Sequence, residues 1–224
     1  MSSRRDFLAT AASTGLLAAM PFDLPLPLHG DERRGASRFA IDDTDLSWVA
    51  KLRGKSRAVF DSPHPSEGAA LFRAVIWRSQ VHSAFGTPLA DITPVVVFRH
   101  EAIPLIMDDA FWAHLGIGKD LKWRDEKTGK WVTSNPLSST PPDAPEYLKD
   151  VNIPAFVKNG GVVLACGLAF GNIVYQYHQK DKLSEADALK RAKEHVLPGV
   201  IIQPSGVFAV LKAQEEGCHY MMGS

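Results

Sequence analysis

Short apolar runs alternate with stretches of helical periodicity from residue 57 to the end of the chain. Runs rich in β-branched and aromatic residues predict strands over 57–61, 93–98, 161–166, 200–203 and 218–221. The second run, 93–98, is almost entirely apolar, which is typical of a strand buried on both faces.

Apolar residues spaced three and four positions apart predict helices between these strands. The first helix is expected to run from Ser66, as its N-cap, to Phe85, where Gly86 ends it. Further helices are expected over 103–115, 168–178, 184–195 and 205–216. Ser184 and Asp187 resemble a capping box at the start of one of these helices. Such repeated alternation implies an α/β sandwich around a mostly parallel sheet of about five strands.

The periodic pattern lapses between residues 116 and 145. Trp123 and Trp131 flank a charged run whose turn is expected at Thr128-Gly129, so this part resembles a small hairpin. A stretch of this length without structure of its own is unusual in a compact domain. Two interpretations stay open: the tryptophans pack down onto the domain, or the loop insertion at 116–145 contacts a partner or ligand.

Composition and charge narrow the function classes. The 224 residues carry 25 basic and 25 acidic side chains, so the formal net charge of zero argues against a nucleic-acid partner. With 45% apolar residues the chain can bury a sizeable core, which excludes wholesale disorder. Two cysteines are too few for a disulfide-rich scaffold or a four-cysteine metal site.

The N-terminus carries Ser3-Arg4-Arg5-Asp6-Phe7-Leu8, followed by a charge-free stretch to Phe22 that is too short for a stable membrane span. This pattern resembles the twin-arginine (Tat) export signal of bacteria, and the resemblance implies a periplasmic or extracellular protein. We therefore expect residues 1–30 to be a signal peptide and linker, and residues 31–224 to form a single α/β domain.

Ligands of open α/β sheets bind outside the carboxyl ends of the strands, so the residues that end each predicted strand are candidates for a site. The first strand brings Asp61 and Ser62 to this edge, the second Arg99, His100 and Glu101, the third Cys166 and Gly167, and the fourth Gln203, Pro204 and Ser205. Cys166 has the strongest chemical case, because a helix N-terminus directly after it favours the thiolate, which is the nucleophile. A structural cysteine in the core is the alternative.

His100 and Glu101 are the second candidates. A histidine at a strand end near a thiolate can serve as proton donor or ion-pair partner, whereas a histidine hydrogen-bonded within a loop is the simpler alternative. Glu101, Gly167 and Ser205 are expected to line the substrate position. The histidines are scattered and no nucleotide or phosphate-binding glycine motif occurs, so we expect neither a metal nor a cofactor.

Cys218 begins its predicted strand, whereas Cys166 ends one. If both strands are parallel, the two thiols lie toward opposite edges of the sheet, and a disulfide needs Cα atoms within about 7 Å. We therefore predict no bridge between Cys166 and Cys218 within one chain.

The C-terminal half resembles the DsrE/DsrF-like family. The resemblance rests on a strand ending in Cys166-Gly167, on residues 197–207 with their Leu-Pro-Gly-Val and Pro-Ser-Gly-Val motifs, and on a closing Gln-Glu-Glu-Gly-Cys-His-Tyr over 214–220. It is specific over 161–222 and weaker over 56–106. It implies a flavodoxin-like three-layer sandwich, homo-oligomers such as trimers or hexamers, and a sulfur-relay role in which Cys166 carries a persulfide.

These observations favour an exported sulfur-relay or thiol-redox protein, a sulfurtransferase-like carrier with a sulfur donor or acceptor protein as partner. A non-catalytic binding or assembly module that uses the Trp-rich 116–145 segment is the alternative. A cofactor-bearing Tat oxidoreductase is a third possibility.

Overall fold

The computed structural model describes residues 44–224, so the predicted export signal and linker lie outside the described residues. Five strands form one parallel sheet in the order β4-β3-β2-β1-β5. They are β1 (Ser56–Ser62), β2 (Ile92–Phe98), β3 (Val162–Cys166), β4 (Val200–Gln203) and β5 (His219–Met222). The predicted α/β class, the parallel sheet and all five predicted strands are confirmed.

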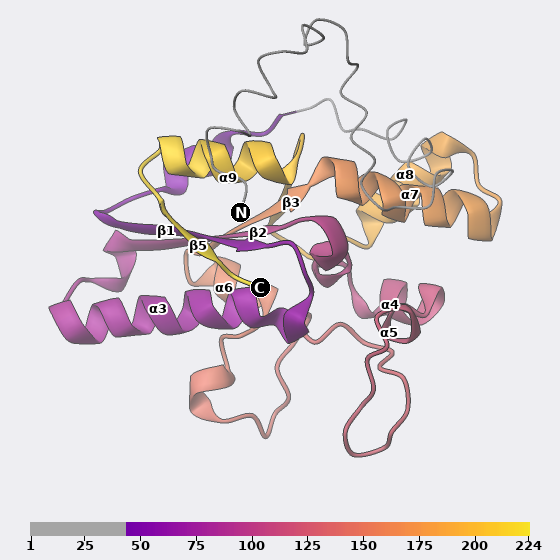
Figure 1. Cartoon of the computed structure of the whole chain (residues 1–224), viewed down its shortest axis with the longest axis horizontal. Helices are drawn as coiled ribbons and strands as arrows, with labels where there is room; N and C mark the ends of the chain where they lie inside the picture. Colours follow the sequence, from indigo (N-terminus) through magenta and orange to yellow (C-terminus); the bar gives the residue numbers. More distant parts are fainter. Residues whose placement is uncertain (1–43) are drawn as a thin grey trace, which may run out of the picture. The chain divides into compact units, whose positions relative to one another are not determined.

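The strand order determines which helices cover each face. From β1 to β4 the chain advances in one direction, so right-handed connections place their helices on one face of the sheet. The return from β4 to β5 crosses the sheet in the other direction and places α9 on the opposite face. Figure 1 shows α9 above the sheet and α3 with α6 below it. The result is the three-layer sandwich of a flavodoxin-like fold.

The face of the sheet opposite α9 carries most of the helices. They are α3 (Ala69–Phe85), α4 (Asp109–Leu115), α5 (Ile117–Asp120), α6 (Ile153–Lys158), α7 (Gly167–Asp181) and α8 (Glu185–Glu194). Their apolar side chains join alternate sheet residues such as Phe60, Val96 and Ala165 in the larger core. The smaller core on the other face lies beneath α9 (Gly206–Glu215) and the 3₁₀ helix η2 (Ser47–Lys51). This alternation follows from the two-residue period of strands.

The predicted N-cap at Ser66 is wrong. Residues Ser66–Gly68 form the 3₁₀ turn η3, in which Glu67 has a φ of 53°, and α3 begins only after Gly68. Gly68 has a φ of 80°, a backbone conformation that glycine adopts without a steric penalty. The chain therefore turns through the left-handed region before the helix starts, and no side chain caps this helix.

The single helix predicted over 103–115 is also wrong. The structure divides this segment into the 3₁₀ helix η5 (His100–Ile106), a bridge between Met107 and Val196, and α4. Met107 and Asp108 have extended backbone, which separates η5 from α4. Asp108 then caps α4 by accepting a hydrogen bond from the Phe111 amide at 2.8 Å. The last three predicted helices are confirmed, with Ser184 and Ser205 as the N-caps of α8 and α9.

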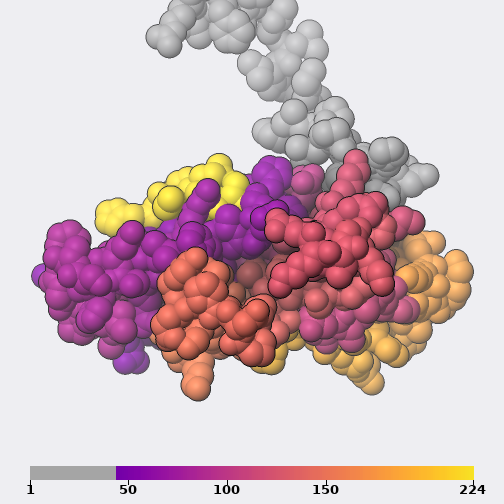
Figure 2. Space-filling view, turned by 90° about the horizontal axis from the view of Figure 1, so that it is seen from below, coloured from indigo at the N-terminus to yellow at the C-terminus, as the bar shows by residue number. Residues whose placement is uncertain are grey.

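The 116–145 segment is held to the domain. The predicted hairpin is present, with an antiparallel bridge between Arg124 and Trp131. The buried amide of Asn135 donates to the carbonyl oxygens of Leu105 and Met107 and accepts from the Leu137 amide. Figure 2 looks onto the face of the molecule that this segment covers, beside α3. Two short 3₁₀ helices, η4 (Leu89–Asp91) and η6 (Glu146–Leu148), complete the fold.

Candidate functional site

The connections of β3 and β4 leave the sheet on opposite faces. β3 runs directly into α7 on the larger core's face, and β4 runs into α9 on the other face. Such a change of direction between neighbouring parallel strands is the switch point where open α/β sheets bind ligands. Cys166 and Gln203 are register partners at the carboxyl ends of these two strands. The predicted thiol therefore lies at the position that the topology favours for a site.

Cys166 forms the N-cap of α7. Its sulfur accepts a hydrogen bond from the Ala169 amide at 3.5 Å, and the residue is 7% exposed. α7 is 15 residues long, so its N-terminal amides and dipole stabilise negative charge on this sulfur. The sulfur also borders the larger core.

Gly167 allows the ends of β3 and β4 to approach each other. A Cβ atom on Gly167 would lie 2.7 Å from the Gln203 carbonyl oxygen and 3.2 Å from that of Pro204. A Cβ atom on Gly206, at the start of α9, would likewise lie 2.5 Å from the Cβ of Arg99. Both glycines keep the strand ends close beside Cys166.

Arg99 supplies the positive charge at this edge. Its guanidinium donates to both carboxylate oxygens of Asp61, at 2.7 and 2.8 Å, and the Tyr220 hydroxyl donates to the same carboxylate at 3.2 Å. Hydrogen bonding to Asp61 is the main cause that raises the pKa of Arg99, and burial opposes it. The charges of Asp61, of Tyr220 and, least, of an ionised Cys166 also raise this pKa.

His100 and Glu101 lie in a neighbouring cluster with His64. The His64 ring meets the His100 ring edge-on at a centroid distance of 6.3 Å, and its Nδ1 lies 3.1 Å from Glu101 Oε2. His100 has a φ of 53°, which is uncommon for a residue other than glycine. The β2 end thus directs Arg99 toward Asp61 and His100 toward His64.

The remaining strand-end residues have defined partners. Ser205 Oγ accepts from the Phe208 amide at 3.1 Å as the N-cap of α9. Gln203 is fully buried and bonds to the Trp48 indole at 3.2 Å and to the Asp45 carbonyl at 2.7 Å. Gln203 therefore ties the end of β4 to the segment that precedes β1.

Cys218 lies in the smaller core, on the other face of the sheet from Cys166, and one residue before β5 begins. Burial raises the pKa of the Cys218 thiol to about 11, and Arg57 only partly opposes this. Cys218 is therefore a protonated thiol at neutral pH. Both cysteines are free in the structure, and they lie toward opposite strand ends, as expected from the sequence. They also lie on opposite faces of the sheet.

Both tryptophans of the 116–145 segment have partners within the chain. Trp123 packs edge-on against the buried Trp112 at a centroid distance of 6.0 Å. The Arg124 guanidinium lies 3.6 Å from the centre of the Trp131 ring. The Trp123 contact supports the interpretation in which the tryptophans pack onto the domain, whereas the Trp131 contact lies within the hairpin.

The sequence predicted that Asp61 and Arg99 lie at the same edge of the sheet as Cys166, but neither was chosen as a site residue. The available signal was that each ends a buried apolar strand with a charged residue. Tyr220 was missed, because its position beside Asp61 depends on β5 pairing with β1.

Within residues 44–224, no helix has the length and apolarity to cross a bilayer, and no group of three or more His, Cys, Asp or Glu side chains could hold a metal ion. Comparison with protein-family models, with curated proteins and with solved structures found no match.

Proposed function

We propose that this protein is an exported sulfur-relay or thiol-redox protein that carries sulfur or electrons on Cys166. One observation carries the proposal: the Cys166 sulfur accepts the Ala169 amide at the N-terminus of α7, at the switch point of the sheet. The resemblance of residues 161–222 to DsrE/DsrF-like proteins supports the same reaction. The predicted export signal favours a reaction outside the bacterial cytoplasm.

The sulfur-transfer step balances without an added oxidant. The Cys166 thiolate attacks the outer sulfur of a donor persulfide and forms a new S–S bond. The donor's own S–S bond breaks, and the donor leaves as a thiolate that takes up a proton. Cys166 then holds the persulfide until an acceptor thiolate removes its outer sulfur.

The surrounding charges suit this chemistry. The Arg99 guanidinium stabilises negative charge on the attacking sulfur and on the persulfide, and Asp61 holds it in position with two hydrogen bonds. His100 and Glu101 stand at the rim of the same edge, where they are suited to contact the donor or move its proton. Gly167 and Ser205 shape the space between α7 and α9.

The thiol-redox form of the proposal requires a cysteine from a partner protein. Cys218 cannot be the second thiol, because it lies on the other face of the sheet with a raised pKa. Sulfur transfer, which needs a single cysteine, therefore has more support from this chain.

A donor or acceptor protein, or a second copy of the chain, needs an apolar surface near the site. α9 exposes Val207 and Leu211, with 60% and 55% of their surface accessible, and Met222 of the neighbouring strand β5 is 51% accessible on the same face of the sheet. This patch supports a homo-oligomer or a partner contact. The Trp-rich hairpin has less support as a contact surface, because its rings are engaged within the chain.

The experiment is incubation of the reduced protein with a small-molecule persulfide donor, followed by intact-mass measurement. We expect wild type and Cys218→Ala to gain one sulfur atom and Cys166→Ser to gain none. An equal gain by Cys166→Ser, or no gain by wild type, would refute the proposal.

A further inference from the structure

A hollow surface lies at the amino-terminal edge of the sheet, opposite the edge that carries Cys166. It consists of two adjoining cavities of about 340 and 520 Å³, and Arg78, Leu89 and Asn159 line both of them. The larger cavity reaches Thr93 at the start of β2 and Gly161 just before β3. Volumes of this size are typical of small-molecule sites.

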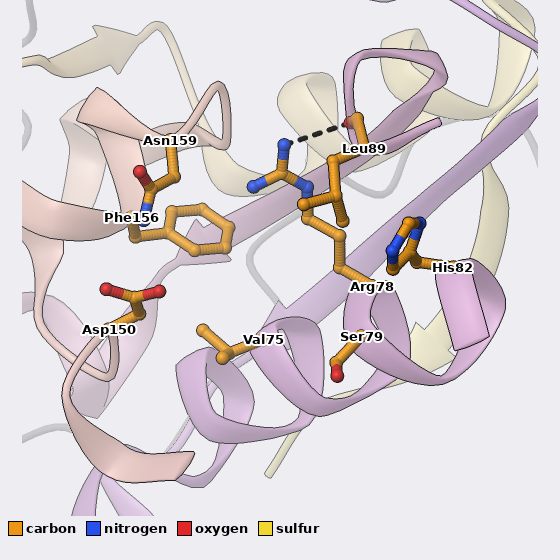
Figure 3. A pocket seen from close by; sticks show the side chains of 8 residues that line it. All are labelled: Val75, Arg78, Ser79, His82, Leu89, Asp150, Phe156 and Asn159. Carbon is orange, nitrogen blue, oxygen red and sulfur yellow. Dashed lines mark hydrogen bonds between the residues drawn. The ribbon is translucent and has the colours of Figure 1, made fainter. Parts of the chain in front are cut away.

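Figure 3 shows the smaller cavity between two elements. Val75 and Arg78 come from α3, and across the gap lie Phe156 of α6 and Asn159, which directly follows α6. The Arg78 side chain crosses this space and one of its terminal nitrogens donates to the Leu89 carbonyl at 2.9 Å. Val75, Leu89 and Phe156 provide apolar surface on either side of the guanidinium.

The charged residues that line the larger cavity are all basic among the residues that the structure describes. Lys51, Arg53, Arg78 and Lys158 line this cavity, and none of its lining residues is acidic among those that the structure describes. The smaller cavity adds a single carboxylate, Asp150. Since the chain as a whole has a formal net charge of zero, this concentration of four cations around one cavity is local.

Arg78 is incompletely compensated where it lies. Its Nε is buried and has no hydrogen-bond partner among the described residues. Burial lowers the pKa of Arg78, and the charge of Asp150 only partly opposes this. Arginine stays charged in proteins, and a buried donor without a partner is costly. An anion in the cavity would compensate the charge and accept from the guanidinium.

We infer that this cavity binds a small phosphorylated compound. Its phosphate lies against Arg78 with the charges of Lys158, Arg53 and Lys51 around it, and its less polar part packs between Val75, Leu89 and Phe156. A phosphate ester suits the site because it brings nearly two negative charges to a guanidinium that binds oxoanions by paired hydrogen bonds.

This site is independent of the reaction proposed for Cys166. The two sites lie at opposite ends of the parallel strands, and they share no residue. If one of the two proposals fails, the other can therefore still be tested.

Isothermal titration calorimetry of the full chain with inorganic pyrophosphate tests the inference. We expect one molecule bound per chain, and an affinity about tenfold or more weaker for Arg78→Gln, because a hydrogen-bonded charge pair is lost. Lys158→Gln should weaken binding by a few-fold. The control Lys55→Gln, which removes an exposed cation outside the cavity, should leave the affinity unchanged.

Circular dichroism establishes whether each variant is folded. If Arg78→Gln does not fold, the pyrophosphate affinity of the double variant Arg53→Gln/Lys158→Gln tests the inference instead. Absence of binding at millimolar pyrophosphate would overturn the inference, as would equal affinities for Lys55→Gln and the cavity variants. Binding of citrate without binding of pyrophosphate would overturn the phosphate assignment.

Discussion

The Arg99 guanidinium binds both carboxylate oxygens of Asp61, at 2.7 and 2.8 Å, across the ends of the neighbouring strands β2 and β1. Asp61 is 2% exposed, so its charge depends on this partner and on the Tyr220 hydroxyl. This ion pair stabilises the carboxyl edge of the sheet and holds the Arg99 charge at the edge that carries Cys166.

Replacement of Arg99 by alanine should destabilise the fold, because it leaves the Asp61 carboxylate buried without its cation. We expect a loss of about 3 kcal/mol in the free energy of unfolding, measured by urea denaturation. Asp61→Asn in the same chain should recover part of this loss. A double variant less stable than Arg99→Ala would contradict the role given to the pair.

Gly167→Ala should disturb the edge through the backbone. The new Cβ would lie 2.7 Å from the Gln203 carbonyl oxygen, and neither main chain can move aside freely. We expect a loss of about 2 kcal/mol or more in thermal or urea unfolding, as for other overpacked positions. The control is Leu168→Ala, an exposed neighbour on the same helix, which should change stability little. Equal effects of the two substitutions would show that the close approach is unimportant.

Because of Cys218, the free energy of unfolding should fall at alkaline pH. Its thiol ionises at about 11 in the folded chain and near its ordinary value of 9.0 when unfolded. The stabilisation from this group is therefore complete below pH 9 and is lost as the pH rises toward 11, because only the unfolded thiol ionises in this window.

The measurement for this prediction is urea unfolding of wild type and Cys218→Ala at pH 8, 9.5 and 10.5. The tyrosines titrate equally in both chains, so the difference between the two chains isolates the thiol. Wild type should lose more stability than Cys218→Ala across the series. Parallel curves for the two proteins would rule out the raised pKa of Cys218.

The 116–145 segment should behave as part of the domain. Asn135→Ala removes two hydrogen bonds that hold the segment to Leu105 and Met107 and one to Leu137 within it, and we expect a loss of about 3 kcal/mol in unfolding free energy. The exposed neighbour Ser134→Ala is the control. If Asn135→Ala were as stable as the control, the segment would be a detachable loop, and its deletion would then be a fair test of the binding-module alternative.

Much of the fold and part of the site follow from the sequence. The two-residue and helical periods locate the strands, and the parallel arrangement brings Asp61, Arg99 and Cys166 to one edge before any coordinates are known. The strand order does not follow from periodicity, so neither the switch point between β3 and β4 nor the contact of Tyr220 with Asp61 could be derived.

Local backbone conformation explains the two wrong helix predictions and the direction of the His100 side chain. Gly68 turns the chain through a positive φ and removes the predicted cap at Ser66. The extended backbone of Met107 and Asp108 interrupts a segment whose apolar spacing alone predicted one helix. At His100 the positive φ directs the ring toward His64, which the order of residues at a strand end could not reveal.

The central claim is that Cys166 carries the transferred sulfur, and the most direct test is to map the sulfur to a residue. Reduced protein is loaded with a persulfide donor, alkylated under non-reducing conditions and digested, and the mass of each cysteine peptide is measured. We predict one additional sulfur on the Cys166 peptide, less of it in Arg99→Ala, and none on the Cys218 peptide. Sulfur on Cys218, or an unmodified Cys166 peptide in fully folded protein, would contradict the account.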